Sequence, residues 1–113
     1  MEVRFHFSER RGEVAVVELP IDDADAALYT VGQVAAMLHV QVAFLRRLDE
    51  LGAVVPVRSS GGQRRYSRRE INRVAALMKL ISEGLTLEGA RRVLELQARV
   101  EELEADLDQA RGQ

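Results

Sequence analysis

Hydrophobic residues recur at helical spacing in the middle of the chain, in two short stretches separated by a tight connection. The first stretch begins behind Thr30 and Gln33, which form a capping-box pattern, and the second begins near Gln41. The apolar positions of the first stretch are Val31, Val34, Ala35 and Leu38. Those of the second are Phe44, Leu45, Leu48 and Leu51. Two such helices in succession predict a helix-turn-helix.

Beyond the second helix the pattern changes to short extended runs. Residues 54–58 and 63–66 flank the pair Gly61-Gly62, and this predicts a small β-hairpin because glycine tolerates the positive φ of a tight turn. A third helix begins at a second capping box, Ser67 to Glu70. Its buried face is predicted to consist of Ile71, Val74, Ala75, Leu77, Met78 and Ile81.

The last helix, expected over residues 86–110, carries a heptad repeat whose outer face is acidic. A domain of this size cannot bury so long an apolar stripe, so the pattern predicts a homodimer. The residues expected in the dimer interface are Val93, Leu96, Val100, Leu103 and Leu107. The alternative is that the stripe folds back onto its own domain.

The N-terminal segment alternates apolar and polar residues, as a half-buried strand does. Val3, Phe5 and Phe7 follow this pattern, and residues 14–19 are rich in valine, so we expect a β-hairpin. Pro20 and the acidic residues after it predict a linker. Since an isolated hairpin is marginally stable, we expect it to pack against its own dimer or to present an edge to a protein partner. The alternative is a loosely ordered extension with no role.

Composition removes several classes of function. The chain has no cysteine, which excludes disulfides, thiolate metal sites and cysteine catalysis, and its two histidines are too isolated to suggest a metal site. No cofactor is expected. No paired carboxylates, nucleophile with base or phosphate loop stands out, so we do not expect an enzyme. Because no apolar run could cross a bilayer and no signal peptide is evident, we expect no membrane contact and a cytoplasmic location.

The net charge of −2 conceals a strong asymmetry along the chain. Residues 1–28 carry a net charge of −4, residues 29–87 one of +5, and residues 88–113 one of −3. A basic middle between acidic ends predicts a nucleic-acid-binding domain with separate interaction segments. The alternative is that the basic residues only solvate a surface.

The order of these parts resembles the MerR family of transcriptional regulators. The matching segments are residues 29–35, 44–52, 56–67 and 83–90, and the resemblance covers roughly residues 28–110. It implies a mainly α-helical fold: a winged helix-turn-helix with a small β-hairpin wing and a C-terminal coiled-coil dimerisation helix. We therefore divide the chain into an N-terminal extension (1–28), a DNA-binding domain (29–85) and a dimerisation helix (86–113).

Double-stranded DNA is the partner that the resemblance implies. The candidate DNA-binding residues are Gln41, Arg46, Arg47, Arg58, Arg64, Arg65 and Tyr66. The first three belong to the recognition helix, where arginine can make two hydrogen bonds to guanine in the major groove. The three arginines that follow belong to the wing and supply cations for phosphates. For Tyr66 two roles are open, a hydrogen bond to a phosphate or packing of the wing onto the third helix.

Two departures from the family pattern concern the recognition helix. Family members usually have two aromatic residues after the recognition arginine, where this chain has Arg47 and Leu48, and Phe44 stands where a threonine is frequent. These changes put the base contacts in question, although not DNA binding itself.

Within the family, the chain looks most similar to the heat-shock repressor subgroup. The similarity lies in the position before the recognition helix, the glycine wing and residues 88–96. This resemblance implies an Hsp70-type chaperone as co-repressor.

The sequence therefore predicts a sequence-specific transcriptional repressor that binds an inverted-repeat operator as a homodimer. Because no sensor domain follows the last helix and cysteines are lacking, we expect no small-molecule effector. Two alternatives use the same fold: a protein-interaction adaptor that has lost specific DNA binding, and an architectural protein whose arginines bind phosphates without sequence preference.

Overall fold

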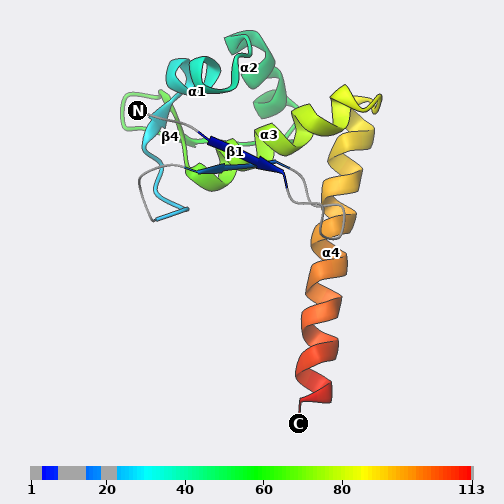
Figure 1. Ribbon diagram of the computed structural model, residues 1–113. Helices are drawn as coiled ribbons and strands as arrows, with labels where there is room; N and C mark the ends of the chain where they lie inside the picture. Colours follow the sequence, from blue (N-terminus) through cyan, green and yellow to red (C-terminus); the bar gives the residue numbers. More distant parts are fainter. Residues whose placement is uncertain (1–3, 8–14, 19–22, 113) are drawn as a thin grey trace.

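The computed structural model of the chain describes residues 4–7, 15–18 and 23–112. These residues form four helices and two small sheets, and in Figure 1 the last helix projects from the body that the other elements form. The elements follow in the order β1 (Arg4–Phe7), β2 (Ala15–Glu18), β3 (Tyr29–Thr30), α1 (Val31–Leu38), α2 (Val42–Glu50), β4 (Val57–Arg58), β5 (Arg64–Tyr66), α3 (Arg68–Ser82) and α4 (Leu87–Arg111). The expected mainly helical fold with a small wing is confirmed.

The helix-turn-helix consists of α1 and α2, and its local signals act as the sequence predicts. The Gln33 amide donates to Thr30 Oγ1 over 3.1 Å, and the Thr30 amide donates to Gln33 Oε1 over 2.8 Å. This capping box satisfies two backbone donors at the start of α1. His39 ends the helix in the left-handed conformation, with φ of 55°. Gln41 is the N-cap of α2, and its side chain makes no capping bond.

The wing is larger than the predicted hairpin, because it belongs to a three-stranded sheet of order β3-β5-β4. The hairpin strands are shorter than residues 54–58 and 63–66 suggested, and β3 adds a partner that places Tyr29 opposite Tyr66. At the wing tip the Gly62 amide donates to the Ser59 carbonyl over 2.8 Å. Gly62 has φ of 81°, a conformation that a residue with a Cβ adopts only at a cost.

The core lies where α1, α2 and the wing meet α3. Its largest fully buried side chains are Tyr66, Leu45, Leu48, Ile71, Leu77, Val34 and Val74. α3 begins at the expected second capping box, in which the Glu70 amide donates to Ser67 Oγ over 3.1 Å and the Ser67 amide to Glu70 Oε1 over 2.8 Å. The buried residues of α1, α2, the wing and α3 thus belong to one apolar cluster.

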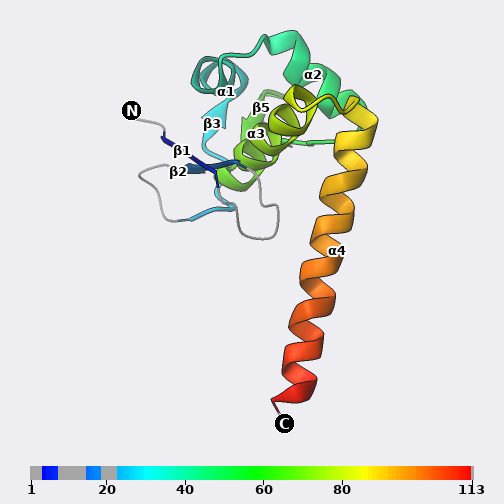
Figure 2. The same ribbon diagram turned by 45° about the vertical axis from the view of Figure 1, so that its right-hand side comes forward.

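α4 has two different halves. Ala90 and Leu94 are buried, Val93 packs partly against the core, and α4 contacts α3, so the first turns belong to the compact body. Four large apolar side chains farther along are 49–65% exposed: Leu96, Val100, Leu103 and Leu107. In both views this part of α4 points away from the other described elements (Figures 1 and 2). Only the beginning of the apolar stripe on α4 thus packs against its own domain.

Both strands of the N-terminal β-hairpin that the alternating pattern predicts are present, as β1 and β2. β1 and β2 pair antiparallel, with Phe5 opposite Val17, and β2 lies against α3. The connection over residues 8–14, together with Val3 and Pro20, lies outside the described residues. Packing against the same chain is therefore shown at the level of the backbone, whereas packing against a dimer partner stays a prediction.

Candidate nucleic-acid interface

The recognition helix α2 has one buried face and one exposed face. Leu45 and Leu48 are fully buried against the core, whereas Arg46 and Arg47, beside them in sequence, are exposed. Gln41 is also exposed, at the amino end of the helix. The leucines fix the orientation of α2, and that orientation leaves the three predicted base-reading side chains in solvent.

Neither guanidinium of Arg46 and Arg47 has a hydrogen-bond or ion-pair partner within the described part of the chain. Unpaired arginine on an exposed helix face is the chemistry that reads guanine or binds phosphate. Leu48, which departs from the aromatic family pattern, is buried and so serves the core. The departure at Arg47 instead adds a second exposed cation to the recognition helix.

Two of the three wing arginines are engaged within the chain. The carboxylate of Asp49, in the last turn of α2, accepts a hydrogen bond from Arg64 Nε over 2.7 Å and one from Arg58 Nη2 over 3.2 Å. Arg65 is partly exposed, and within the described residues no ion pair of its side chain is found. Sequence reasoning missed Asp49, because a single acidic residue in a helix carries no signal of its distant partners.

Tyr66 lies in the core, with 1% of its surface exposed. Its hydroxyl is buried and has no hydrogen-bond partner among the described residues, and burial raises the pKa of this phenol above its usual value. Of the two roles left open for Tyr66, burial of the side chain favours the packing role. A phosphate could reach this hydroxyl only if the wing moved.

The arginines of α3 that flank the wing also have partners. Arg73 Nε donates to the Ala53 carbonyl over 2.7 Å, which ties α3 to the segment after α2. Arg69 Nε pairs with Asp25 Oδ1 over 2.7 Å, and the Arg69 amide donates to the Ala24 carbonyl over 3.0 Å. The hydrogen bond and charge of Arg69 lower the pKa of Asp25. Ala24 and Asp25 of the acidic linker thus lie at the start of α3.

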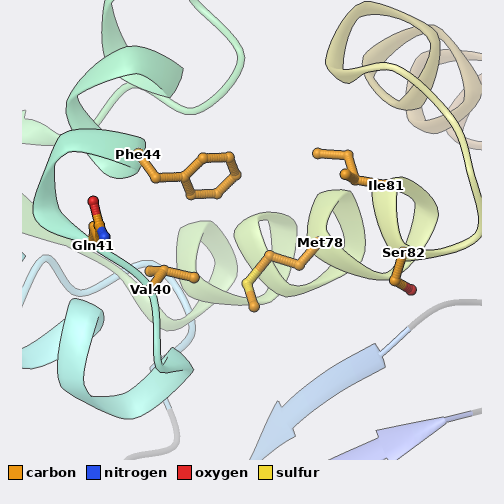
Figure 3. A pocket seen from close by; sticks show the side chains of 6 residues that line it. All are labelled: Val40, Gln41, Phe44, Met78, Ile81 and Ser82. Atoms are coloured by element: carbon orange, nitrogen blue, oxygen red, sulfur yellow. The ribbon is translucent and has the colours of Figure 1, made fainter.

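An open apolar groove of about 380 Å³ separates the start of α2 from the end of α3 (Figure 3). It is lined by Val40, Gln41, Phe44, Met78, Ile81 and Ser82. Phe44 extends from α2 toward Ile81 and Met78, and it packs against the core while remaining partly exposed. The structure therefore places Phe44 between helices, as a packing residue would be.

Among the described residues, no group of three or more histidine, aspartate or glutamate side chains is placed to hold a metal ion. Of the helices described, none is long and apolar enough to span a bilayer.

The chain is similar to a known family of regulatory proteins. Residues 29–97 match the family described as "MerR HTH family regulatory protein". A Streptomyces coelicolor protein assigned as heat shock protein HspR is 37% identical over 82 residues, which are 72% of this chain. The chain spans about half of that relative, 54% of its length.

Solved structures share the fold at low sequence identity. One is HiNmlR, a MerR-family regulator lacking the sensor domain, bound to promoter DNA. It has a TM-score of 0.58 at 22% identity, and the match covers 74% of this chain and 67% of the HiNmlR chain. A MerR-family regulator from Bacillus cereus has a TM-score of 0.57 at 18% identity, with 73% and 67% covered. The N-terminal part of the Bacillus subtilis multidrug transporter activator, MtaN, has a TM-score of 0.55 at 19% identity, with 73% and 96% covered.

Proposed function

Because this chain belongs to the MerR family of helix-turn-helix regulatory proteins, we propose that it is a repressor that binds a specific inverted-repeat operator as a homodimer. The family is one of DNA-binding regulators and not of enzymes. In this proposal residues 29–85 bind double-stranded DNA in the cytoplasm and residues 86–113 form the dimer.

The observation that carries the proposal is the exposed face of α2. Arg46 and Arg47 project from a helix whose opposite face is locked into the core, and neither has a partner in the described chain. A rigid helix with free guanidinium groups suits the major groove, where each bidentate arginine–guanine contact contributes about 1–3 kcal/mol of discrimination. Gln41 at the start of the helix and Arg65 on the wing complete the proposed contacts to base and phosphate.

Homodimerisation is supported by the second half of α4. Its four large apolar side chains alternate at the a and d positions of a heptad repeat, and each is 49–65% exposed. A second copy of α4 would cover them, and a two-fold axis would then pair with an inverted repeat in the DNA. Val93 is already partly packed on its own domain, so we expect it at the border of this interface.

Repression is supported by the similarity to the Streptomyces coelicolor HspR protein. The heat-shock subgroup further suggests an Hsp70-type chaperone as co-repressor, a partner that would bind outside the DNA-contacting face. An effect of purified chaperone on operator affinity would test this part separately.

The experiment that tests the function is genome-wide mapping of sites bound by the full chain, followed by a footprint of the strongest site. Arg46→Ala should abolish enrichment at that site, while Arg92→Ala, which removes the same charge from an exposed position on α4, should retain it. No enriched site for the wild type would favour the adaptor. Broad occupancy without a footprint would favour the architectural protein.

A further inference from the structure

The side chain of Asp49 joins the recognition helix to both strands of the wing. Its Oδ2 atom lies 2.7 Å from Arg64 Nε on β5 and 3.2 Å from Arg58 Nη2 on β4, and only 13% of the Asp49 side chain is exposed. Arg58 Nη1 also donates to the Gly62 carbonyl at the wing tip over 3.1 Å. One carboxylate therefore connects α2 with each strand of the hairpin and, through Arg58, with its turn.

The end of α2 is an unfavourable place for the negative charge of Asp49. Asp49 lies in the last turn of α2, where the helix dipole is negative and a cation is stabilising. The two guanidinium groups compensate for this, through charge-assisted hydrogen bonds of the kind that arginine also forms with phosphate. The pairing is a long-range one, because Asp49 and Arg64 are 15 residues apart in the chain.

We propose that Asp49 is a positioning and specificity-determining residue, a resident carboxylate that occupies Arg58 and Arg64 in place of DNA phosphates. It holds the wing at a set distance from α2 before DNA arrives, and it withholds two cations from indiscriminate phosphate binding. Sequence discrimination then rests on Arg46 and Arg47. This inference rests on the proposed function, since it concerns how the same surface distinguishes one DNA sequence from another.

The proposal requires stronger binding to arbitrary DNA without a gain on the specific site, whereas a purely structural ion pair would require losses on both. Without the Asp49 charge, Arg58 and Arg64 become available to phosphates anywhere, so binding to arbitrary DNA should strengthen. Each additional phosphate contact steepens the dependence of log affinity on log salt by about 0.9. The wing meanwhile loses its fixed position, so binding to the specific site should weaken or stay constant.

The test compares Asp49→Asn with Asp108→Asn in the full chain. Both variants remove one negative charge, but Asp108 lies exposed in the last turns of α4, far from the wing. Fluorescence anisotropy at several salt concentrations would measure binding to the footprinted duplex and to a scrambled duplex of equal composition. We expect Asp49→Asn to lower the ratio of specific to scrambled affinity at least about ten-fold and to steepen the salt slope on scrambled DNA by about 1–2. Asp108→Asn should change neither quantity.

A second variant separates released charge from damage to the fold. Adding Arg64→Gln to Asp49→Asn removes one freed cation and should bring the salt slope back toward the wild-type value. If Asp49→Asn does not fold, Asp49→Glu serves instead: it keeps the charge and shifts its position, so the ratio should fall while the slope stays constant.

The outcomes distinguish this inference from the proposed function. A wild type that binds both duplexes equally would contradict the proposed function, and the salt slope on scrambled DNA would still test the role of Asp49. An Asp49 variant that matches Asp108→Asn in both ratio and slope would overturn the inference and leave the proposed function intact.

Discussion

Replacing Tyr66 by phenylalanine tests directly whether this residue packs the wing or binds DNA. The change removes one oxygen atom and retains the ring, which is fully buried in the core. In the described residues the hydroxyl has no hydrogen-bond partner. We therefore expect Tyr66→Phe to leave DNA affinity unchanged and to stabilise the fold.

The magnitude follows from the missing partner. A buried polar group without a hydrogen bond costs about 1–3 kcal/mol of desolvation, and its removal recovers part of that cost. The small void left by the oxygen offsets some of the gain, so we expect the free energy of unfolding to rise by about 1 kcal/mol.

Burial of the phenol also predicts a dependence on pH. Burial raises the Tyr66 pKa in the folded chain, so the folded state retains its proton at a pH where the unfolded chain loses it. The corresponding stability is complete below the ordinary tyrosine pKa of about 10 and declines as the pH rises beyond it. Tyr66→Phe should therefore lose less stability above that pH than the wild type.

Urea denaturation followed by circular dichroism measures the stability, and fluorescence anisotropy on the footprinted duplex measures binding. Tyr29→Phe is the matched control, because Tyr29 lies opposite Tyr66 in the sheet and its hydroxyl is likewise buried. Loss of DNA affinity in Tyr66→Phe but not in Tyr29→Phe would refute the packing role and restore the phosphate contact. Destabilisation by more than about 1 kcal/mol would show that the hydroxyl has a partner.

Three further predictions concern the other parts of the chain. Arg46→Ala should cost about 1–3 kcal/mol on the footprinted duplex and little on scrambled DNA, measured by anisotropy; equal losses on both would contradict base readout. Leu103→Asp should give monomers by light scattering and much weaker operator binding, and a variant that remains dimeric would exclude this interface. Deleting residues 1–25 removes β1, β2 and the Asp25–Arg69 ion pair, so the melting temperature should fall while operator affinity stays within a few-fold; an unchanged melting temperature would leave the segment without a structural role.

The features that the sequence predicts well are those encoded within a few residues. The capping boxes at Thr30 and Ser67 form with their expected partners, since each joins groups three positions apart. The apolar periodicities locate α1 to α4 to within a few residues for the same reason. Exposure of Arg46 and Arg47 follows as well, because Leu45 and Leu48 define the opposite face of α2.

The features that only the tertiary structure decides depend on segments far apart in the chain. A two-residue strand such as β3 has no periodicity of its own, and it exists because β5 offers a partner. The burial of Tyr66 and the division of α4 into a packed and an exposed half likewise depend on where α3 lies. The pairing of Arg58 and Arg64 with Asp49 is the clearest case. The sequence assigns these arginines their charge, but only the folded arrangement decides whether a carboxylate or a phosphate lies within hydrogen-bonding distance of them.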